Sequence, residues 1–170
     1  MTRLRVLCVS ALLLLAGCAK PDLPDLKVRA ATPSEFSSFK TDLERRFPKE
    51  HLEPLETALT ELQWDAMHRG IKASADRELD MLAKIDGKTV REAQILGWQA
   101  RRERLRREIA SMTEIRAHNQ RLAEKTAATG TPESVLTHLH NAEDILARQN
   151  RDLAATEHRL LQWALAPANR

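Results

Sequence analysis

The sequence predicts an all-α protein, a helical bundle followed by a long antiparallel helical hairpin of coiled-coil type. Apolar residues recur at spacings of three and four along the chain, and no stretch alternates strictly as a half-buried strand would. Capping residues precede several of these periodic stretches. Near the C-terminal end leucine recurs at every seventh position, which is the repeat of a coiled-coil seam; these residues are Leu139, Leu146, Leu153 and Leu160.

Three short helices are expected before the hairpin. The first begins at Pro33, because Thr32 is a good N-cap and Glu35 completes the capping pattern, and Pro48 ends it. Its apolar stripe is Phe36, Phe39, Leu43 and Phe47. The second begins near Pro48 or Pro54 and ends at Gly70, with a stripe of Leu52, Leu55, Leu59, Leu62 and Ala66. The third covers about 74–85, with Leu79, Leu82 and Ile85 on one face.

The hairpin is expected to have two long arms. A capping box at Thr89 and Glu92 begins the first arm, which continues to about Thr126. Residues 129–132 break the helix, and a last helix continues to about Leu165. The short loop requires antiparallel arms, with facing residue numbers that sum to roughly 258, such as Met112 with Leu146, Leu105 with Leu153, Trp98 with Leu160 and Ile95 with Trp163.

Each arm would be on the order of 50 Å long at 1.5 Å per residue. That is longer than a compact bundle of this size needs. Part of the hairpin is therefore expected to project, to be covered by the first three helices, or to pair with another copy of the chain.

The N-terminal segment has the pattern of a secretory signal. Arg3 and Arg5 precede an apolar run from Val6 to Leu15, which is too short to serve as a permanent membrane-spanning helix. The run ends in Leu15-Ala16-Gly17-Cys18. These four residues resemble the lipobox of bacterial lipoproteins, in which the cysteine is acylated and becomes the mature N-terminus.

The lipobox resemblance implies a location and one modified residue. Cys18 would carry acyl chains such as palmitate and anchor the protein in a lipid bilayer without spanning it. Ala19 stands where an aspartate would favour retention in the inner membrane, so the resemblance implies an outer-membrane lipoprotein that faces the periplasm.

Processing would change the charge and thiol content of the chain. Removal of residues 1–17 takes away two of the 27 Lys and Arg residues and none of the 24 acidic ones, which leaves a net charge of about +1. We therefore expect no nucleic acid partner. Of the two cysteines, Cys8 would leave with the signal and Cys18 would be acylated, so the folded part is expected to contain no disulfide.

The chain then divides into four parts. Residues 1–17 form the signal peptide, and residues 18–31, which carry two prolines and no helical period, form the lipidated N-terminus and a tether. Residues 32–87 form the short helices and residues 88–170 the long hairpin.

One charged run stands out as a candidate contact with an anionic partner. Arginines occupy five of seven positions in it, namely Arg101, Arg102, Arg104, Arg106 and Arg107. Arginine clusters bind phosphate and carboxylate groups well. The alternative is a solvated face in which Glu103 pairs with Arg107 and Glu108 with Arg104 at helical spacing.

No catalytic residue, metal site or cofactor is expected. His138 and His140 lie two residues apart on a helix and point to nearly opposite sides, so they cannot share an ion. The sequence contains no nucleophile elbow and no glycine-rich phosphate loop. Trp64, Trp98 and Trp163 are expected to pack in the core, with an exposed Trp163 as the exception of interest.

A second resemblance covers residues 35–90. A phenylalanine-bearing helix, a leucine-rich helix and then Ala83-Lys84-Ile85-Asp86-Gly87-Lys88-Thr89 are similar to small uncharacterised helical lipoproteins of Gram-negative bacteria. The long hairpin lies outside this resemblance, which brings no assigned activity and no site residue beyond Cys18.

The sequence thus predicts a lipid-anchored, non-enzymatic binding or assembly accessory of an envelope complex, with a protein partner of unknown identity. One alternative is a pilotin-like carrier that escorts an outer-membrane client, which would need an exposed apolar groove between the first three helices. The other is an envelope sensor or structural spacer that self-associates through the leucine heptads.

Overall fold

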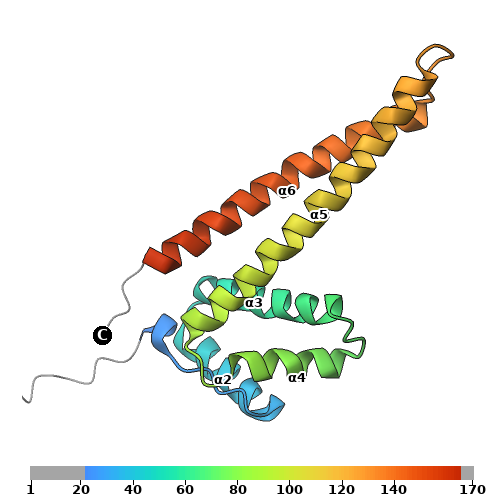
Figure 1. Cartoon of the computed structure of the whole chain (residues 1–170). Helices are drawn as coiled ribbons and strands as arrows, with labels where there is room; N and C mark the ends of the chain where they lie inside the picture. The colour runs from blue at the N-terminus through green and yellow to red at the C-terminus, as the bar shows by residue number, and fades with distance from the viewer. Residues whose placement is uncertain (1–21, 166–170) are drawn as a thin grey trace, which may run out of the picture.

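The computed structural model describes residues 22–165, and every regular element in this part of the chain is a helix. The all-α fold class is confirmed. Short helices form a bundle, and two long helices extend from it (Figure 1). The elements are the 3₁₀ helix η1 (Leu23–Asp25) and the α-helices α2 (Pro33–Arg46), α3 (Lys49–His68), α4 (Ser74–Ile85), α5 (Val90–Thr126) and α6 (Glu133–Leu165).

Two helix starts follow the predicted capping chemistry. The Thr32 hydroxyl accepts a hydrogen bond from the backbone N–H of Glu35 at 3.2 Å, at the start of α2. At the start of α5, the Thr89 hydroxyl accepts from the backbone N–H of Glu92 at 3.2 Å, and the Glu92 carboxylate accepts from the backbone N–H of Thr89 at 2.7 Å. The hydrogen bonds that the Thr89 backbone N–H and hydroxyl donate to the Glu92 carboxylate lower the pKa of this carboxyl below its ordinary value.

The core lies between α2, α3 and α4. Helix α3 begins just after Pro48, and Pro54 lies inside it. All five residues of its predicted leucine stripe are buried, against apolar side chains of the two neighbouring helices. Those neighbours are Phe36, Phe39 and Leu43 of α2 and Met81, Leu82 and Ile85 of α4.

Two apolar residues expected to pack inward are exposed instead. Trp64 of α3 is 49% exposed and Leu79 of α4 is 53% exposed. Successive helical residues turn by about 100°, so each of them lies roughly 200° from buried neighbours two positions away. Met81 takes the buried position on α4. The prediction that Trp64 packs in the core is therefore wrong.

The prediction that residues 18–31 form a tether is wrong for the described residues 22–31. Val28 and Ala30 are each only 2% exposed. The Val28 N–H donates to the Lys88 carbonyl at 2.8 Å, and the Ala30 N–H donates to the Asp86 carboxylate at 2.8 Å. These partners lie in the turn between α4 and α5, far along the chain, so local composition gave no sign of them. Residues 18–21, with Cys18, lie outside the described residues.

Two ion-paired carboxylates, Asp65 and Asp80, connect the C-terminal part of α3 to α4. Asp80 pairs with Arg69, and Lys84 lies 3.0 Å from Asp65 and 3.3 Å from Asp80. The hydrogen bond from Arg69 lowers the pKa of the Asp80 carboxyl. Burial alone would raise the pKa of Asp65, but hydrogen bonds from Lys84 and Arg69 outweigh it, so that the pKa falls.

Helices α5 and α6 form an antiparallel pair joined by the loop 127–132, in which Gly130 has a φ of 95°. The Trp98 and Trp163 rings meet edge to face with centroids 5.8 Å apart, and the Gln149 amide donates to Glu108 at 3.3 Å. Both contacts agree with the predicted register to within one helical turn.

The seam between the two long helices is not wholly apolar. Leu146 is buried, and the polar Thr156, three residues after Leu153 of the heptad repeat, is only 1% exposed. The Thr156 hydroxyl donates to the Asp152 carbonyl at 2.7 Å, so its burial leaves no hydroxyl unsatisfied.

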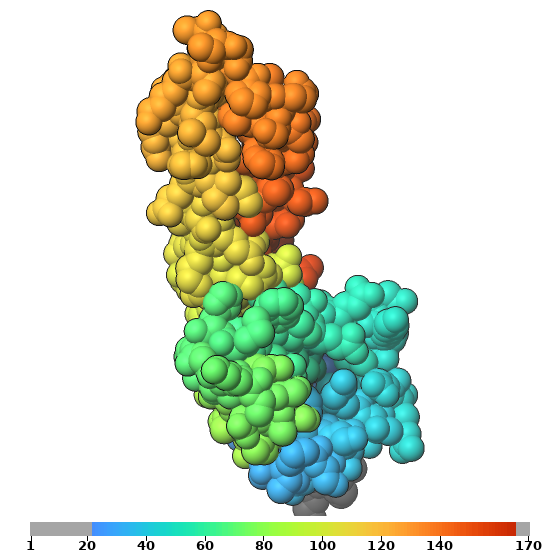
Figure 2. Space-filling model, turned by 90° about the vertical axis from the view of Figure 1, so that its right-hand side faces the viewer, coloured from blue at the N-terminus to red at the C-terminus, as the bar shows by residue number. Residues whose placement is uncertain are grey.

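The two long helices differ in what they contact. Within the described residues α6 packs only against α5, whereas α5 also packs against α3, α4 and η1. The distal half of the hairpin projects from the short helices, as two perpendicular views show (Figures 1 and 2). Of the three arrangements left open by the sequence, the described chain thus combines two, a covered base and a projecting tip.

Candidate functional site

The arginine run lies where α5 crosses α3, and a glycine determines how closely the two helices approach. Gly97 is inside α5, and a Cβ atom at this position would overlap the backbone and the Cβ of Ala58 on α3. The two backbones are therefore in direct contact at this point. The following turns of α5 carry Arg101 and Arg104, which the close crossing brings over α3.

Glu61 of α3 receives these two arginines. Its side chain is only 6% exposed. One edge of the Arg104 guanidinium binds both carboxylate oxygens, at 2.8 Å from Nε to Oε2 and 2.6 Å from Nη2 to Oε1. Arg101 adds a third hydrogen bond at 3.2 Å. The carboxylate therefore has charged partners for both oxygens, which is the condition for burying it.

Glu61, Arg101 and Arg104 form a cluster, the Glu61 cluster, that extends to the second long helix. Arg104 also donates to Glu108 at 2.8 Å, and Glu108 accepts from Gln149 of α6. The hydrogen bonds to Glu61 raise the pKa of the Arg104 guanidinium above its ordinary value. One chain of polar contacts thus joins α3, α5 and α6.

The other arginines of the run point elsewhere. Arg106 pairs with Glu157 of α6 at 2.8 Å and with Glu103 at 3.2 Å, and Arg102 pairs with Glu103 at 3.0 Å. The predicted pair of Arg104 and Glu108 is present. The predicted pair of Glu103 and Arg107 is wrong, because Glu103 bonds to Arg102 and Arg106.

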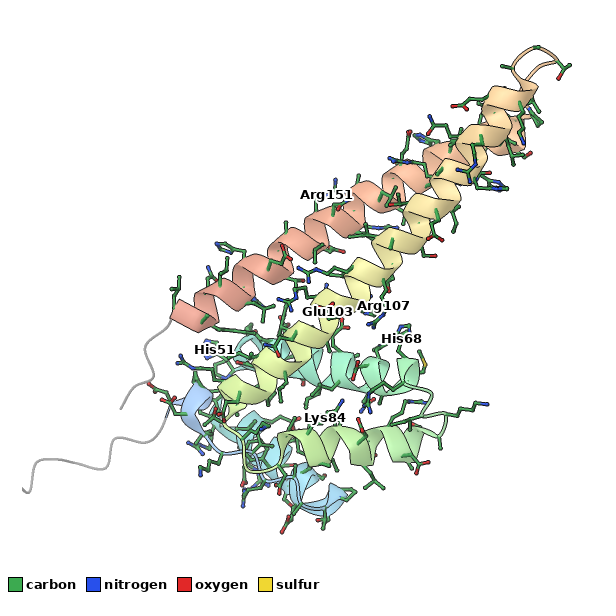
Figure 3. All side chains as sticks on the ribbon, viewed as in Figure 1. His51, His68, Lys84, Glu103, Arg107 and Arg151 are labelled. Carbon is green, nitrogen blue, oxygen red and sulfur yellow. The ribbon has the colours of Figure 1, made fainter. Side chains whose placement is uncertain are left out.

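The run is therefore mostly a set of contacts within the protein. Arg101 and Arg104 are held by Glu61, and Arg102 and Arg106 pair with Glu103, so four of the five arginines have partners within the chain. Arg107 is exposed and, within the described residues, makes no ion pair. Figure 3 shows it on α5, on the side toward the C-terminal half of α3 that carries His68. Contact of the run with an anionic partner stays a prediction, and Arg107 is the member whose guanidinium is left for it.

A second cluster stabilises the base of the hairpin through its aromatic rings. The Trp98 indole is 9% exposed, and its N–H donates to the Pro54 carbonyl of α3 at 3.2 Å. The guanidinium of Arg159 lies 4.7 Å from the centroid of the Trp98 ring and 5.9 Å from that of Trp163. Such cation–π contacts hold α6 on α5. The expected core packing of Trp98 is confirmed, and Trp163 is half-buried beside it.

Sequence reasoning missed Glu61, although it had one usable signal. Glu61 follows Ala58 by one helical turn, on a flank of the leucine stripe. A carboxylate that lies beside buried apolar residues needs a cationic partner, which another helix can supply. The five-arginine run was the obvious source. Acidic residues three and four positions away on the same helix can also pair with that run, so its sequence does not point to a partner on α3.

His138 and His140, the pair considered as metal ligands, take no part in these contacts. His138 and His140 are exposed on α6, and His140 lies 3.5 Å from Asp144. Between residues 22 and 165, no group of three His, Cys, Asp or Glu side chains is placed to hold a metal ion.

Comparisons with known proteins do not extend these observations. Of the helices described here, none combines the length and apolarity needed to cross a membrane. No family model matches the chain, and searches of curated proteins and of solved structures also find no match.

Proposed function

We propose that this protein is a non-enzymatic binding or assembly accessory of an envelope complex. Acylated Cys18 anchors it to the outer membrane on the periplasmic side. The distal half of the α5–α6 hairpin holds its protein partner. The observation that carries the proposal is the projection of this half away from the bundle (Figure 1).

The distal hairpin leaves most of its surface available to a partner. The last side-chain bonds between α5 and α3 are those of Glu61 with Arg101 and Arg104, and more than 20 further residues of α5 follow them. Ile115 and Leu136 on this part are each 46% exposed. A projecting pair of helices with exposed apolar side chains is suited to helix-to-helix contact with another protein.

Shortening the hairpin should abolish partner capture without unfolding the bundle. Deleting residues 113–126 together with residues 133–146 removes facing segments and keeps the loop 127–132. Each arm loses about 21 Å of length at 1.5 Å per residue. The Glu61 cluster and the Trp98–Trp163 contact are retained. A photo-crosslinking residue at position 107, on the part of α5 that both forms retain, should give a discrete adduct in the full-length form and lose it in the shortened form.

The control places the same crosslinker at position 79 on α4. Leu79 is 53% exposed, comparable to Ile115 and Leu136 of the distal hairpin at 46%. Adducts of equal yield from position 107 in the shortened and full-length proteins would overturn the proposed role of the hairpin. Circular dichroism of both forms checks that the remaining helices are folded.

Changing Cys18 to Ser should release the protein from the membrane. Acyl chains contribute roughly 0.8 kcal/mol for each buried methylene group, and stable anchoring needs two or more chains. Without them the folded protein should appear in the soluble periplasmic fraction. Fractionation with mass measurement of the intact chain tests this, and membrane attachment of an unacylated C18S variant would contradict the proposed anchor.

The two alternative functions receive less support. A carrier of the pilotin type needs an exposed apolar groove between α2, α3 and α4, but Phe36, Phe39 and Leu43 are buried in the core. Self-association through the leucine heptads needs those leucines to be available. Within the hairpin, Leu146 is buried and the other three are half-buried.

A further inference from the structure

The last two turns of α6 form an apolar strip at the base of the hairpin. From Leu160 to Leu165 the sequence is Leu-Leu-Gln-Trp-Ala-Leu, without a charged residue, in a chain of which 30% of residues are charged. Leu161 is 61% exposed and Leu165 is 82% exposed. These are the two most exposed large apolar side chains among the described residues.

The strip borders an open groove. Ile95 of α5 lines the groove together with Leu160, Leu161 and Ala164 of α6, and its other side is polar, with Gln99, Arg102 and Glu157. Nothing else in the described chain packs on this end of α6, since α6 contacts α5 alone. Exposed apolar surface of this kind marks an interaction site.

The strip also lies at the end of the molecule where the chain enters from Cys18. The Val90 N–H, at the start of α5, donates to the Leu26 carbonyl just after η1 at 2.8 Å. Ile95 follows Val90 by about 7.5 Å along the helix axis at 1.5 Å per residue. Figure 1 shows η1 and the end of α6 on the same side, opposite the tip of the hairpin.

The length of chain outside the described part limits how far this end can be from an anchor. Cys18 is four residues before Asp22, the first described residue. Even fully extended, four residues span at most about 14 Å. Because residues 22–31 are packed into the bundle, they add no slack. A lipid on Cys18 therefore holds the base of the hairpin close to the bilayer surface.

We infer that the end of α6, through Leu161 and Leu165, lies in the interfacial layer of the phospholipid bilayer beside the lipid anchor. This inference rests on the proposed acylation of Cys18. Exposed leucines on an amphipathic helix are side chains that enter this layer. Arg159, directly before the strip, stacks on Trp98 and Trp163 and can keep its charged end toward water. In this orientation the tip of the hairpin points away from the membrane.

A single fluorescent label tests this orientation, because the mature chain would contain no free thiol. We would place an environment-sensitive dye on L161C or L165C in the acylated full-length protein. The protein is reconstituted into vesicles of phosphatidylethanolamine and phosphatidylglycerol, with and without spin-labelled lipid. Both labels should shift their emission to shorter wavelength in vesicles and lose most of it when the spin-labelled lipid is present.

The matched control is L136C at the tip of the hairpin, where the label should remain in water and unquenched. Adding L161D in the L165C background should return the label at position 165 to water, because a charge in the strip opposes insertion. If the labels at positions 161 and 165 report water, as the label at position 136 does, in a protein that is acylated, the inference is overturned while the proposed anchor stands. A shielded label that spin-labelled lipid does not quench would also overturn it and would indicate a second protein copy on the strip. Loss of acylation, read from the intact mass, would overturn the proposed function as well.

Discussion

Replacing Gly97 with Ala should lower the free energy of unfolding by about 2 kcal/mol or more. Helix propensity alone gives the opposite sign, since alanine is favoured over glycine inside a helix by about 1 kcal/mol. The added Cβ would overlap the backbone of Ala58, which cannot rotate away as a side chain can. Separating two packed helices to make room costs about 1–3 kcal/mol, and more where backbone must move.

Thermal unfolding of the purified full chain, followed by circular dichroism, measures this effect. At about 2–4 °C for each kcal/mol, the midpoint should fall by at least about 4 °C. The matched control is A110G on the exposed face of the same helix, which tests propensity without a packing partner and should cost about 1 kcal/mol. A higher midpoint for G97A than for the unchanged protein would show that α5 does not cross α3 through this glycine.

The same glycine illustrates what the sequence could and could not reveal. The chain has five glycines, and those at positions 70 and 130 have positive φ angles at the helix ends that the sequence predicted. Gly97 has an ordinary helical conformation, so no local rule explains it. Its reason is the partner helix, which lies some 40 residues earlier in the chain.

The helix boundaries, in contrast, were predicted well from local sequence. The caps at Thr32 and Thr89 and the break around Gly130 depend on residues within one or two turns of each other. The buried face of α3 followed from its leucine spacing. Residues 22–31 escaped prediction because their hydrogen-bond partners belong to the turn after α4. Prolines and a lack of periodicity look the same in a tether and in an irregular segment packed into a core.

In the candidate site too, local sequence was informative and the long-range partners were not. The number and spacing of the arginines marked the right stretch of α5, but their partners decide what it does. Glu61 and Glu157 come from α3 and α6, so only the crossing of the helices reveals them. Arg107 is left exposed by the geometry of the helix crossing, and the sequence offered no means of separating it from its neighbours.

Removing Arg104 should destabilise the protein by about 3–5 kcal/mol, because it would leave the buried Glu61 carboxylate with Arg101 as its remaining cation. We would measure R104M by chemical denaturation of the full chain. The matched control is R106M in the same helix. Arg106 and its partners Glu103 and Glu157 are all more than 40% exposed, so the loss of its two pairs should cost no more than about 1 kcal/mol.

A double-mutant cycle separates the ion pair from the packing of its side chains. E61L should cost less than R104M, since the freed Arg104 keeps Glu108 and reaches water. Replacing both residues, in E61L/R104M, should return the stability close to that of the unchanged protein, because an apolar pair of similar volume substitutes well for a buried ion pair. Equal losses for R104M and R106M would show that burial of Glu61 carries no energetic weight. Recovery in the double variant would show that this ion pair contributes no more to stability than an apolar pair of similar volume. Under the proposed lipid anchor, a helix crossing of fixed geometry would place the tip of the hairpin at a fixed distance from the membrane.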